Sequence, residues 1–362
     1  MGMKTWLLES LPIVAMVVIQ ILDVGLTTIS KAAMSKGMSR FVFVVYSNAL
    51  ATLILLPYAL IFERKRRPPL TFSLLCKFFL LSLCGISLMQ NCVFTGVNYS
   101  SPTLASALSN LIPAFTFLLA IIFRMENLDL KNSKFQIKIL GTLVSISGAL
   151  IIIFYKGPTI GTLPDSSTEN GHPLKPSYST MLATTNNWVI GGIFLVIAGL
   201  SNSVSIISQA AILKNYPSEM TVVSFYCLFG TIQCGAFSLA VERDPNAWRL
   251  TPDVQLASVF YSAIAGSVLT FSVQMWCIQK KGPLFVAMFT PLGIAVAALM
   301  SGIFLGDSLH VGSVIGAVII VIGFYGVMWA QKNREKSVTH EVDRQQSSSL
   351  QKTPLLASQT PV

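Results

Sequence analysis

The sequence predicts an all-α integral membrane protein with about ten transmembrane helices arranged as two inverted five-helix repeats. Three observations lead there: an apolar composition, about ten apolar runs of membrane-spanning length, and a match between two distant stretches of the chain. Residues 102–128 align without a gap with residues 283–309 at a constant offset of 181. Such a repeat inside a membrane protein is typical of transporters built from two related halves around a central site.

The composition excludes a single large water-soluble core. The 362 residues are 53% hydrophobic and only 11% charged, with a mean hydropathy of +0.67. Soluble domains carry roughly 25% charged residues, so a chain with several membrane spans is expected. The first apolar run is long enough to span a bilayer and to stay in it, which argues against a cleaved signal peptide.

A spanning helix needs about 20 mostly apolar residues. Runs of this kind cover residues 11–33, 41–62, 74–97, 102–123, 136–155, 188–212, 219–241, 254–278, 284–305 and 311–330. We therefore divide the chain into a cytoplasmic N-terminus (1–10), a first repeat (11–155), an extracytoplasmic loop (156–187), a second repeat (188–330) and a disordered cytoplasmic tail (331–362).

The two repeats correspond along most of their length. Residues 29–33 resemble residues 207–211, Glu63-Arg64 falls on Glu242-Arg243, and Gly85 falls on Gly266. Further along, Gly141 and Gly148 fall on Gly316 and Gly323 after a short insertion. Each half then holds five spans, and because five is odd, the second half must enter the membrane from the opposite side.

The distribution of basic residues sets the orientation. With the N-terminus in the cytoplasm, eighteen Lys and Arg residues lie inside and seven outside, so both termini are expected in the cytoplasm. The net charge of +10 comes from these short loops, which speaks against a nucleic-acid partner. The six cysteines lie mostly within apolar segments without a CxxC pair, so neither a metal, a disulfide nor another cofactor is expected.

Several motifs resemble a known plant family. They are Lys31-Ala32-Ala33, Gly37-Met38-Ser39, the run 101–108, Pro113-Ala114, Phe123-Arg124-Met125-Glu126, Tyr155-Lys156-Gly157-Pro158, the run 281–285 and Gly312-Ser313. Together they are similar to the Walls-Are-Thin-related, nodulin-like group, also called usually-multiple-acids-move-in-and-out transporters, of the EamA class of drug/metabolite transporters. The resemblance covers roughly residues 11–331.

This resemblance implies ten helices in two inverted halves and movement of amino acids, or in some members auxin, across the plasma membrane or the vacuolar membrane. The chain departs from the family in two places. Gly306-Asp307 stands where many relatives have Gly-Glu. Tyr46 is followed by Ser47 and Asn48, where the second helix often carries a basic residue.

Asp23 is the candidate coupling residue, because it lies near the middle of the first span. A carboxylate there costs roughly 2.5–3.5 kcal/mol on insertion scales, so it needs a purpose. It can bind a substrate ammonium or a proton in a central cavity, or it can hydrogen-bond a neighbouring helix. Lys31, near the outer end of the same span, can attract a substrate carboxylate or extend to the lipid headgroups.

Uncharged amides inside apolar runs suggest a polar cavity. They can bind both ends of a zwitterion, or they can join helices for about 0.6 kcal/mol each. The set is Gln20, Asn48, Asn91, Asn110, Asn202, Gln209 and Gln274, and we place the substrate near Asp23, Asn48, Asn110, Gln209 and Gln274.

Two prolines and two acids mark candidate breaks and gates. Pro113 and Pro291 lie within the fourth and ninth spans, where a missing N–H interrupts the helix. Such breaks either border a binding site or only kink the helix. Glu126 and Asp307 end their helices and serve either as gates or as caps of the following turn.

An embedded enzyme is the first competing class, but the three histidines lie in or beside loops and form no catalytic set. A receptor has no evident use for a symmetric repeat. We therefore expect a transporter, not an enzyme, that moves amino acids by alternating access in the plasma membrane, with the vacuolar membrane as the alternative and protons as a further partner. Carriers of auxin-like acids and exchangers of sugar nucleotides or phosphates remain as alternatives; the latter call for buried Lys or Arg.

Overall fold

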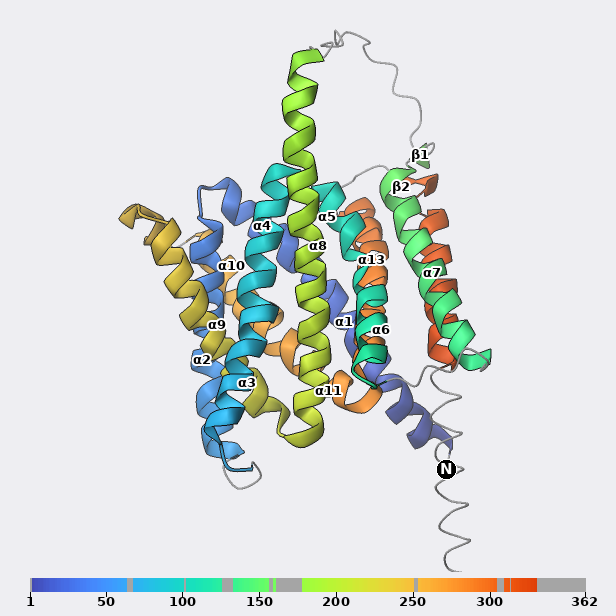
Figure 1. Cartoon of the computed structure of the whole chain (residues 1–362), viewed down its shortest axis with the longest axis horizontal. Coiled ribbons are helices and arrows are strands. Elements are labelled where there is room, and N and C mark those ends of the chain that lie inside the picture. Colours follow the sequence, from blue (N-terminus) through green and yellow to red (C-terminus); the bar gives the residue numbers. More distant parts are fainter. Residues whose placement is uncertain are drawn as a thin grey trace, which may run out of the picture.

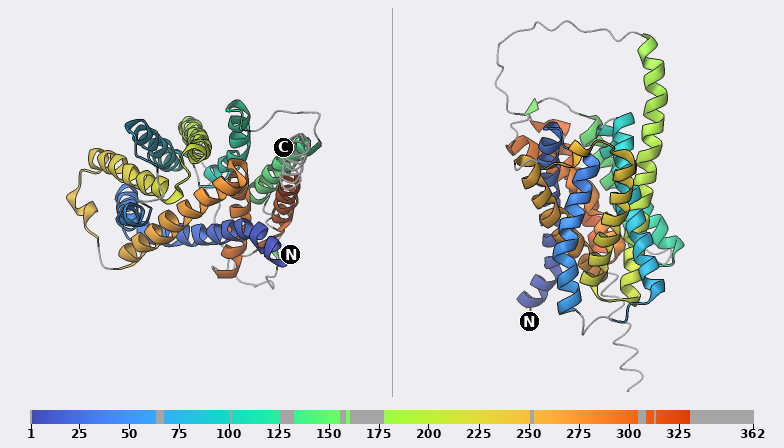
Figure 2. Two further views of the ribbon diagram at one scale, coloured as in Figure 1. Left: turned by 90° about the horizontal axis from the view of Figure 1, so that it is seen from below. Right: turned by 90° about the vertical axis from the view of Figure 1, so that its left-hand side faces the viewer.

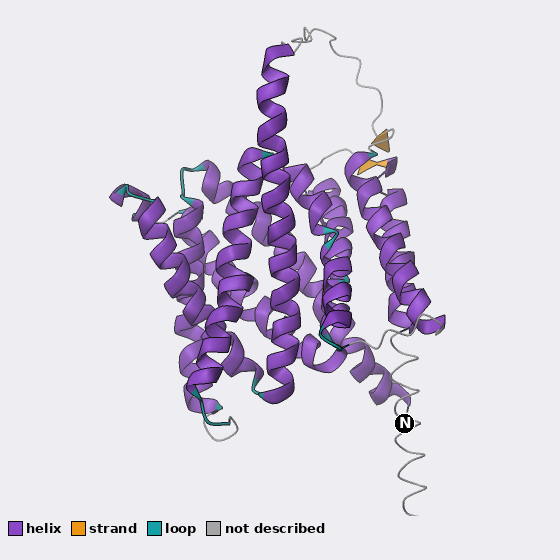
Figure 3. Ribbon diagram, in the orientation of Figure 1, coloured by secondary structure: helices purple, strands orange, loops and turns teal. Residues whose placement is uncertain are grey.

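The computed structural model describes residues 2–63, 68–100, 102–125, 133–155, 159–160, 178–250, 253–304, 309–312 and 314–330. They form a bundle of helices that run back and forth between two ends (Figure 1). Two short strands, β1 (Thr159–Ile160) and β2 (Leu309–His310), pair antiparallel at one end. The rest of the regular structure is helical (Figure 3), as the apolar runs predicted.

The first half contains α1 (Gly2–Ser35), α2 (Arg40–Phe62), a third span, α5 (Pro102–Ser109), α6 (Ile112–Ile122) and α7 (Ser133–Phe154). The third span consists of α3 (Phe72–Ser82), the π-helical segment η1 (Leu83–Leu88) and α4 (Met89–Tyr99). The wide turns of η1 were not predicted from the sequence.

The second half repeats this order. It contains α8 (Tyr178–Asn215), α9 (Glu219–Val241), the 3₁₀ turn η2 (Pro245–Trp248), an eighth span, α12 (Pro283–Ala287), α13 (Phe289–Phe304) and the helix Val314–Ala330. The eighth span consists of α10 (Val254–Tyr261), the π-helical η3 (Ser262–Leu269) and α11 (Thr270–Lys281). α8 begins ten residues before the apolar run at 188, because a helix can continue into water beyond the span that lipid requires.

Among the described residues, eight helices are long and apolar enough to cross a membrane, and two shorter apolar helices, Pro283–Ala297 and Val314–Ala330, complete the expected ten. The start of α1 and the end of helix Val314–Ala330 lie at the same end of the bundle, which we call the near end (Figure 1). The opposite end, beyond which α8 projects, is the far end (Figures 1 and 2).

Contacts between α2 and α9 follow the inverted repeat. At an offset of 179, Ser39 corresponds to Ser218, Thr52 to Thr231 and Glu63 to Glu242. The hydroxyls of Thr52 and Thr231 lie 3.3 Å apart. Ser218 donates to Glu63, and Ser39 donates to Glu242 over 2.7 Å. Equivalent residues therefore exchange contacts across a pseudo-two-fold axis, as in an isologous interface.

The same symmetry joins α7 to helix Val314–Ala330. A Cβ on Gly141 would lie 2.7 Å from the carbonyl oxygen of Gly323, and one on Gly148 would lie 2.8 Å from that of Gly316. In the repeat, Gly141 corresponds to Gly316 and Gly148 to Gly323. Gly141 therefore contacts the equivalent of Gly148, and Gly148 contacts the equivalent of Gly141. The two backbones approach this closely only because no side chain stands between them.

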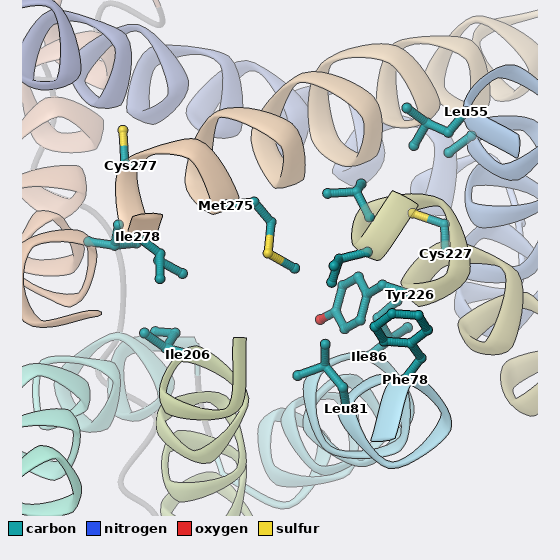
Figure 4. Packing of buried hydrophobic residues seen from close by; sticks show 14 of the residues in the cluster. Leu55, Phe78, Leu81, Ile86, Ile206, Tyr226, Cys227, Met275, Cys277 and Ile278 are labelled. Carbon is teal, nitrogen blue, oxygen red and sulfur yellow. The ribbon is translucent and has the colours of Figure 1, made fainter. Parts of the chain in front are cut away.

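Buried apolar side chains from both halves fill the centre of the bundle. Phe78, Ile86, Tyr226 and Met275 are almost completely buried and lie close together, with Tyr226 directed toward the bundle centre (Figure 4). At the near end Phe285 and Phe289 have ring centroids 5.1 Å apart and are fully buried. The second half is thus closely packed where α12 joins α13 at the near end.

Candidate substrate site

A cavity of about 390 Å³ lies between the two halves. This volume falls within the range of small-molecule sites, roughly 300–1,000 Å³. Helices of both halves contribute to its wall. Its polar lining residues are Gln20, Asp23, Thr27, Asn202, Gln209, Tyr226, Thr270, Gln274 and Thr290. Its apolar lining includes Met16, Ile19, Met89, Ile206, Phe271, Val286 and Ile294.

The cavity opens toward the far end. Its lining residues nearer the near end, such as Met16, Gln209 and Val286, are at most 5% exposed. Thr27, which lies farthest along α1, is exposed. The lining is therefore buried toward the near end and more exposed toward the far end.

Five of the nine polar candidates meet here: Gln20, Asp23, Asn202, Gln209 and Gln274. Asn48 and Asn110 do not line the cavity. Asn48 is buried in α2 and donates to the carbonyl of Val44 over 2.9 Å. Asn110 is fully buried and donates to Ser106 over 2.9 Å. Both amides therefore donate within their own segment of chain, and their Oδ1 atoms are buried without a described donor.

The remaining candidates divide between described and undescribed parts of the chain. α5 ends at Ser109 and α6 begins at Ile112, so the fourth span is interrupted just before the buried Pro113. α12 ends at Ala287 and α13 begins at Phe289, just before Pro291. Lys31 belongs to α1, but its side chain, like residues Glu126 and Asp307, lies outside the described part of the structure.

Asp23 contacts a hydroxyl that already has a partner. Its Oδ1 lies 3.3 Å from Oγ1 of Thr270, and the same Oγ1 lies 2.8 Å from the carbonyl oxygen of Ala265. Ala265 belongs to η3, where π-helical turns move carbonyls out of the ordinary ladder. A hydroxyl carries a single hydrogen, so Thr270 can donate to Ala265 or to Asp23 but not to both. The contact with Ala265 is the shorter one, so the Thr270 hydroxyl lies between the two acceptors and can donate to either of them.

Two of the three glutamines that line the cavity have their amide nitrogens turned to the protein. Gln20 donates from Nε2 to the carbonyl oxygen of Phe289 over 2.8 Å. Gln209 donates from Nε2 to Oγ of Ser205 over 3.2 Å. The Oε1 atom of Gln209 is buried and accepts no hydrogen bond from the described residues. One lining residue thus has a buried amide oxygen without a donor among the described residues.

Tyr226 is a cavity residue that the sequence did not reveal. Gly85 in η1 makes room for it: a Cβ there would lie 2.3 Å from the Tyr226 hydroxyl and 2.2 Å from Oγ of Ser205. A tyrosine in an apolar span is ordinarily read as packing, and only the placement of Gly85 opposite it shows that its hydroxyl reaches the cavity. Thr270 and Thr290 also line the cavity, and they too are residues that are ordinary within an apolar span.

Comparisons with known proteins agree with this architecture. The EamA-like transporter family model matches twice, at residues 11–154 and 189–329. The WAT1-related protein At3g28050 of Arabidopsis thaliana is 43% identical over 99% of this chain and 98% of its own. Protein WALLS ARE THIN 1 of the same plant is 38% identical over 92% of this chain and 87% of its own.

A protein of known crystal structure shares the fold, with a TM-score of 0.65 and 12% identity, over 88% of this chain and 98% of its own. Two matches to one family model agree with a chain built from two related halves, and the relatives extend over nearly its full length. The chain is therefore a multi-pass membrane transporter of small molecules and belongs to the WAT1-related group of the EamA-like transporter family.

Proposed function

We propose that the protein transports amino acids by alternating access between its two halves. One observation carries this proposal: the cavity between the halves holds a carboxylate and several uncharged amides, and none of its described lining residues is Lys, Arg or His. Asp23 and the oxygen of Gln209 suit an ammonium group. The amides of Asn202 and Gln274 suit the carboxylate of the same zwitterion.

The charge of the lining also ranks the alternatives. A sugar nucleotide or phosphate brings two or more negative charges, which proteins hold with Arg or Lys. An auxin-like acid brings one negative charge next to Asp23. Neither finds an opposite charge among the described lining residues, so both are less favoured than a zwitterion.

The orientation follows from the basic residues. We place the near end in the cytoplasm, which makes the present conformation outward-open, and we assign the protein to the plasma membrane, with the vacuolar membrane as the alternative. Rocking of the halves about the interruptions before Pro113 and Pro291 would close the far end and open the near end. Glu126 and Asp307, which follow these segments, stay candidates for gates.

Proton coupling fits the contact between Asp23 and Thr270. An empty, outward-open carrier with a proton on Asp23 keeps Thr270 bonded to Ala265. Arrival of a substrate ammonium from the cytoplasmic side would displace that proton to water, so that one proton enters for each substrate that leaves. The carboxylate is then the shared site of proton and substrate.

The test is efflux of a labelled amino-acid mixture from preloaded vesicles, with and without an imposed pH gradient. Wild-type efflux should rise with the gradient, whereas any efflux by Asp23→Asn should be insensitive to it. Gradient-independent efflux in both proteins would leave a facilitator with a structural Asp23. Absence of amino-acid efflux in the wild type would overturn the substrate assignment and favour auxin-like acids.

A further inference from the structure

We infer that the cavity recognises a primary ammonium through acceptor oxygens alone, so that amphiphilic monoamines without a carboxylate are also ligands. This deepens the proposed function, since it uses the same cavity, and adds a class of substrate to it. The inference rests on how three side chains of the lining are oriented: Asp23, Gln20 and Gln209.

Gln209 presents a carbonyl oxygen with no donor. Its residue is only 4% exposed, and its Nε2 is held by Ser205, which is itself buried. The rotation that this bond fixes leaves Oε1 without a partner among the described residues. A buried acceptor in that condition is costly, so a donor supplied by a ligand is gained at no expense of an existing bond.

Gln20, from the first half, also has its Nε2 bonded to the protein. Its Nε2 donates to Phe289 at the start of α13. Its Oε1 lies against Gly293, where a Cβ would approach it to 2.6 Å, and Gly293 also lines the cavity. Both glutamines therefore donate to the protein through Nε2, and a ligand that displaces the packing around Oε1 would find an acceptor on each.

Asp23 supplies the third acceptor group and the only ionisable carboxyl group of the described lining. A primary ammonium has three N–H donors, which matches two amide oxygens and a carboxylate in number and sign. Phe271, Ile206 and Ile294 offer apolar walls for the body of the ligand. The chemistry is that of an organic cation with an apolar or aromatic skeleton.

Among the described lining residues, Asp23 is the only charged group, so no positive side chain of the lining competes with a cationic ligand. Tyr226 faces the cavity, and Tyr261 from α10 donates its hydroxyl to the carbonyl of Leu22 beside Asp23. η3 and α13, which also pack on α1, contain no charged residue. On α11 the charged residues are Lys280 and Lys281 at the near end, outside the cavity lining. On α1 itself, Lys31 lies two turns beyond Asp23.

A monoamine also simplifies the exchange of charge. When it binds, the proton on Asp23 leaves to water, the carboxylate pairs with the ammonium, and no covalent bond changes. The cavity gains one positive charge with the ligand and loses one with the proton. A zwitterion brings an additional carboxylate that must find donors of its own, whereas a monoamine does not.

Three compounds with one ring system test the inference on the purified full-length protein: tryptamine, tryptophan and indole-3-acetate. Binding is measured by calorimetry, and proton release is measured in weakly buffered solution. We expect tryptamine to bind at least as tightly as tryptophan and at least about tenfold more tightly than indole-3-acetate. About one proton should be released per tryptamine by the wild type, and none by Asp23→Asn.

Two matched variants separate recognition from packing. Gln209→Leu should weaken tryptamine binding about tenfold, the loss of one hydrogen bond to a charged group. Gln90→Leu is the control, because Gln90 also has a buried Oε1 without a described partner but lies outside this cavity. It should bind tryptamine as the wild type does.

Equal affinity for indole-3-acetate and tryptamine would overturn the inference, as would equal effects of the two glutamine variants. Tryptophan transport without tryptamine binding would refute the acceptor site and leave the proposed function intact. Tryptamine binding by a protein that moves no amino acid would do the reverse.

Discussion

The two π-helical segments occupy equivalent places in the repeat but do different chemistry. In the first half the carbonyl of Cys84 accepts a hydrogen bond from Ser201 over 2.8 Å. In the second half the equivalent carbonyl, that of Ala265, accepts from Thr270, which also contacts Asp23. Ser201 stands where the repeat aligns Asp23. One half thus closes its exposed carbonyl with a hydroxyl, and the other links it to a group that can ionise.

This difference shows how a duplicated framework acquires an asymmetric site. The wide turns and the glycines at Gly85 and Gly266 are shared, so the backbone geometry is common to both halves. What differs is the side chain that faces the released carbonyl. Variants of repeat-related pairs are therefore the natural way to examine the site, because each member serves as the control for the other.

The largest difference is expected between Gly85→Ala and Gly266→Ala. A methyl group at Gly85 would collide with Ser205 and Tyr226, whereas at Gly266 it would meet Cδ2 of Leu26 at 2.7 Å, the far end of a flexible side chain. We expect Gly85→Ala to cost about 2–3 kcal/mol of stability, at the upper part of the range for overpacking, and Gly266→Ala under about 1 kcal/mol. Thermal unfolding in detergent measures both, and similar losses would contradict the assigned packing of Tyr226.

An intermediate difference is expected between Glu63→Gln and Glu242→Gln. Oε2 of Glu63 accepts from the hydroxyl of Ser218, and from the backbone N–H and the hydroxyl of Thr221 over 3.1 and 2.7 Å. The only described side-chain bond of Glu242 is that from Ser39. Glu63 lies at the near end, so its neutralisation should favour opening of that end. A loss of about 1 kcal/mol of bonding free energy would raise the population of the near-end-open conformation about fivefold to tenfold.

Labelling of a cysteine introduced at Val286 reports this opening, since Val286 lines the closed end of the cavity. Its labelling rate should rise in Glu63→Gln and stay near the wild-type rate in Glu242→Gln. If Glu242→Gln raised the rate as much, the near-end contacts would not hold that end shut.

The smallest difference is expected between Ser201→Ala and Thr270→Val. These two residues are not at repeat-related positions, but they donate to the equivalent carbonyls of Cys84 and Ala265. Each removes one hydroxyl from a helix carbonyl and should cost about 1 kcal/mol of stability. Only Thr270→Val should alter the pH dependence of substrate binding, because only Thr270 contacts Asp23. Thr270→Ser, which keeps the hydroxyl, should restore it. An unchanged pH profile in Thr270→Val would show that the contact with Thr270 does not influence the ionisation of Asp23.

Much of the fold could be predicted because it depends on hydropathy and self-similarity. The ten spans follow from runs of apolar residues, and the inverted arrangement follows from the repeat and an odd number of spans. The π-helical segments could not be predicted, since no residue type marks them: Gly85 and Gly266 read as ordinary small residues.

The sequence predicted which polar residues lie within the membrane spans, but not which side of the helix each of them faces. A polar residue inside an apolar run, such as Asn48 or Gln209, lies within the membrane in either case. Which way it faces depends on its neighbours, and a membrane helix is apolar both toward lipid and toward protein. Gln209 faces the cavity, whereas Asn48 bonds within α2. Tyr226 and Thr270 carry no sequence signal that separates them from packing residues.

The glycine contacts between α7 and helix Val314–Ala330 have a consequence for synthesis of the chain. The face of α7 that carries Gly141 and Gly148 has its partner in the last described helix, more than 160 residues later. The first half therefore cannot complete its packing while the ribosome is still making the second. Until then the glycine face of α7 must be covered by lipid or by the insertion machinery. A chain that ends before residue 314 lacks the helix against which α7 packs.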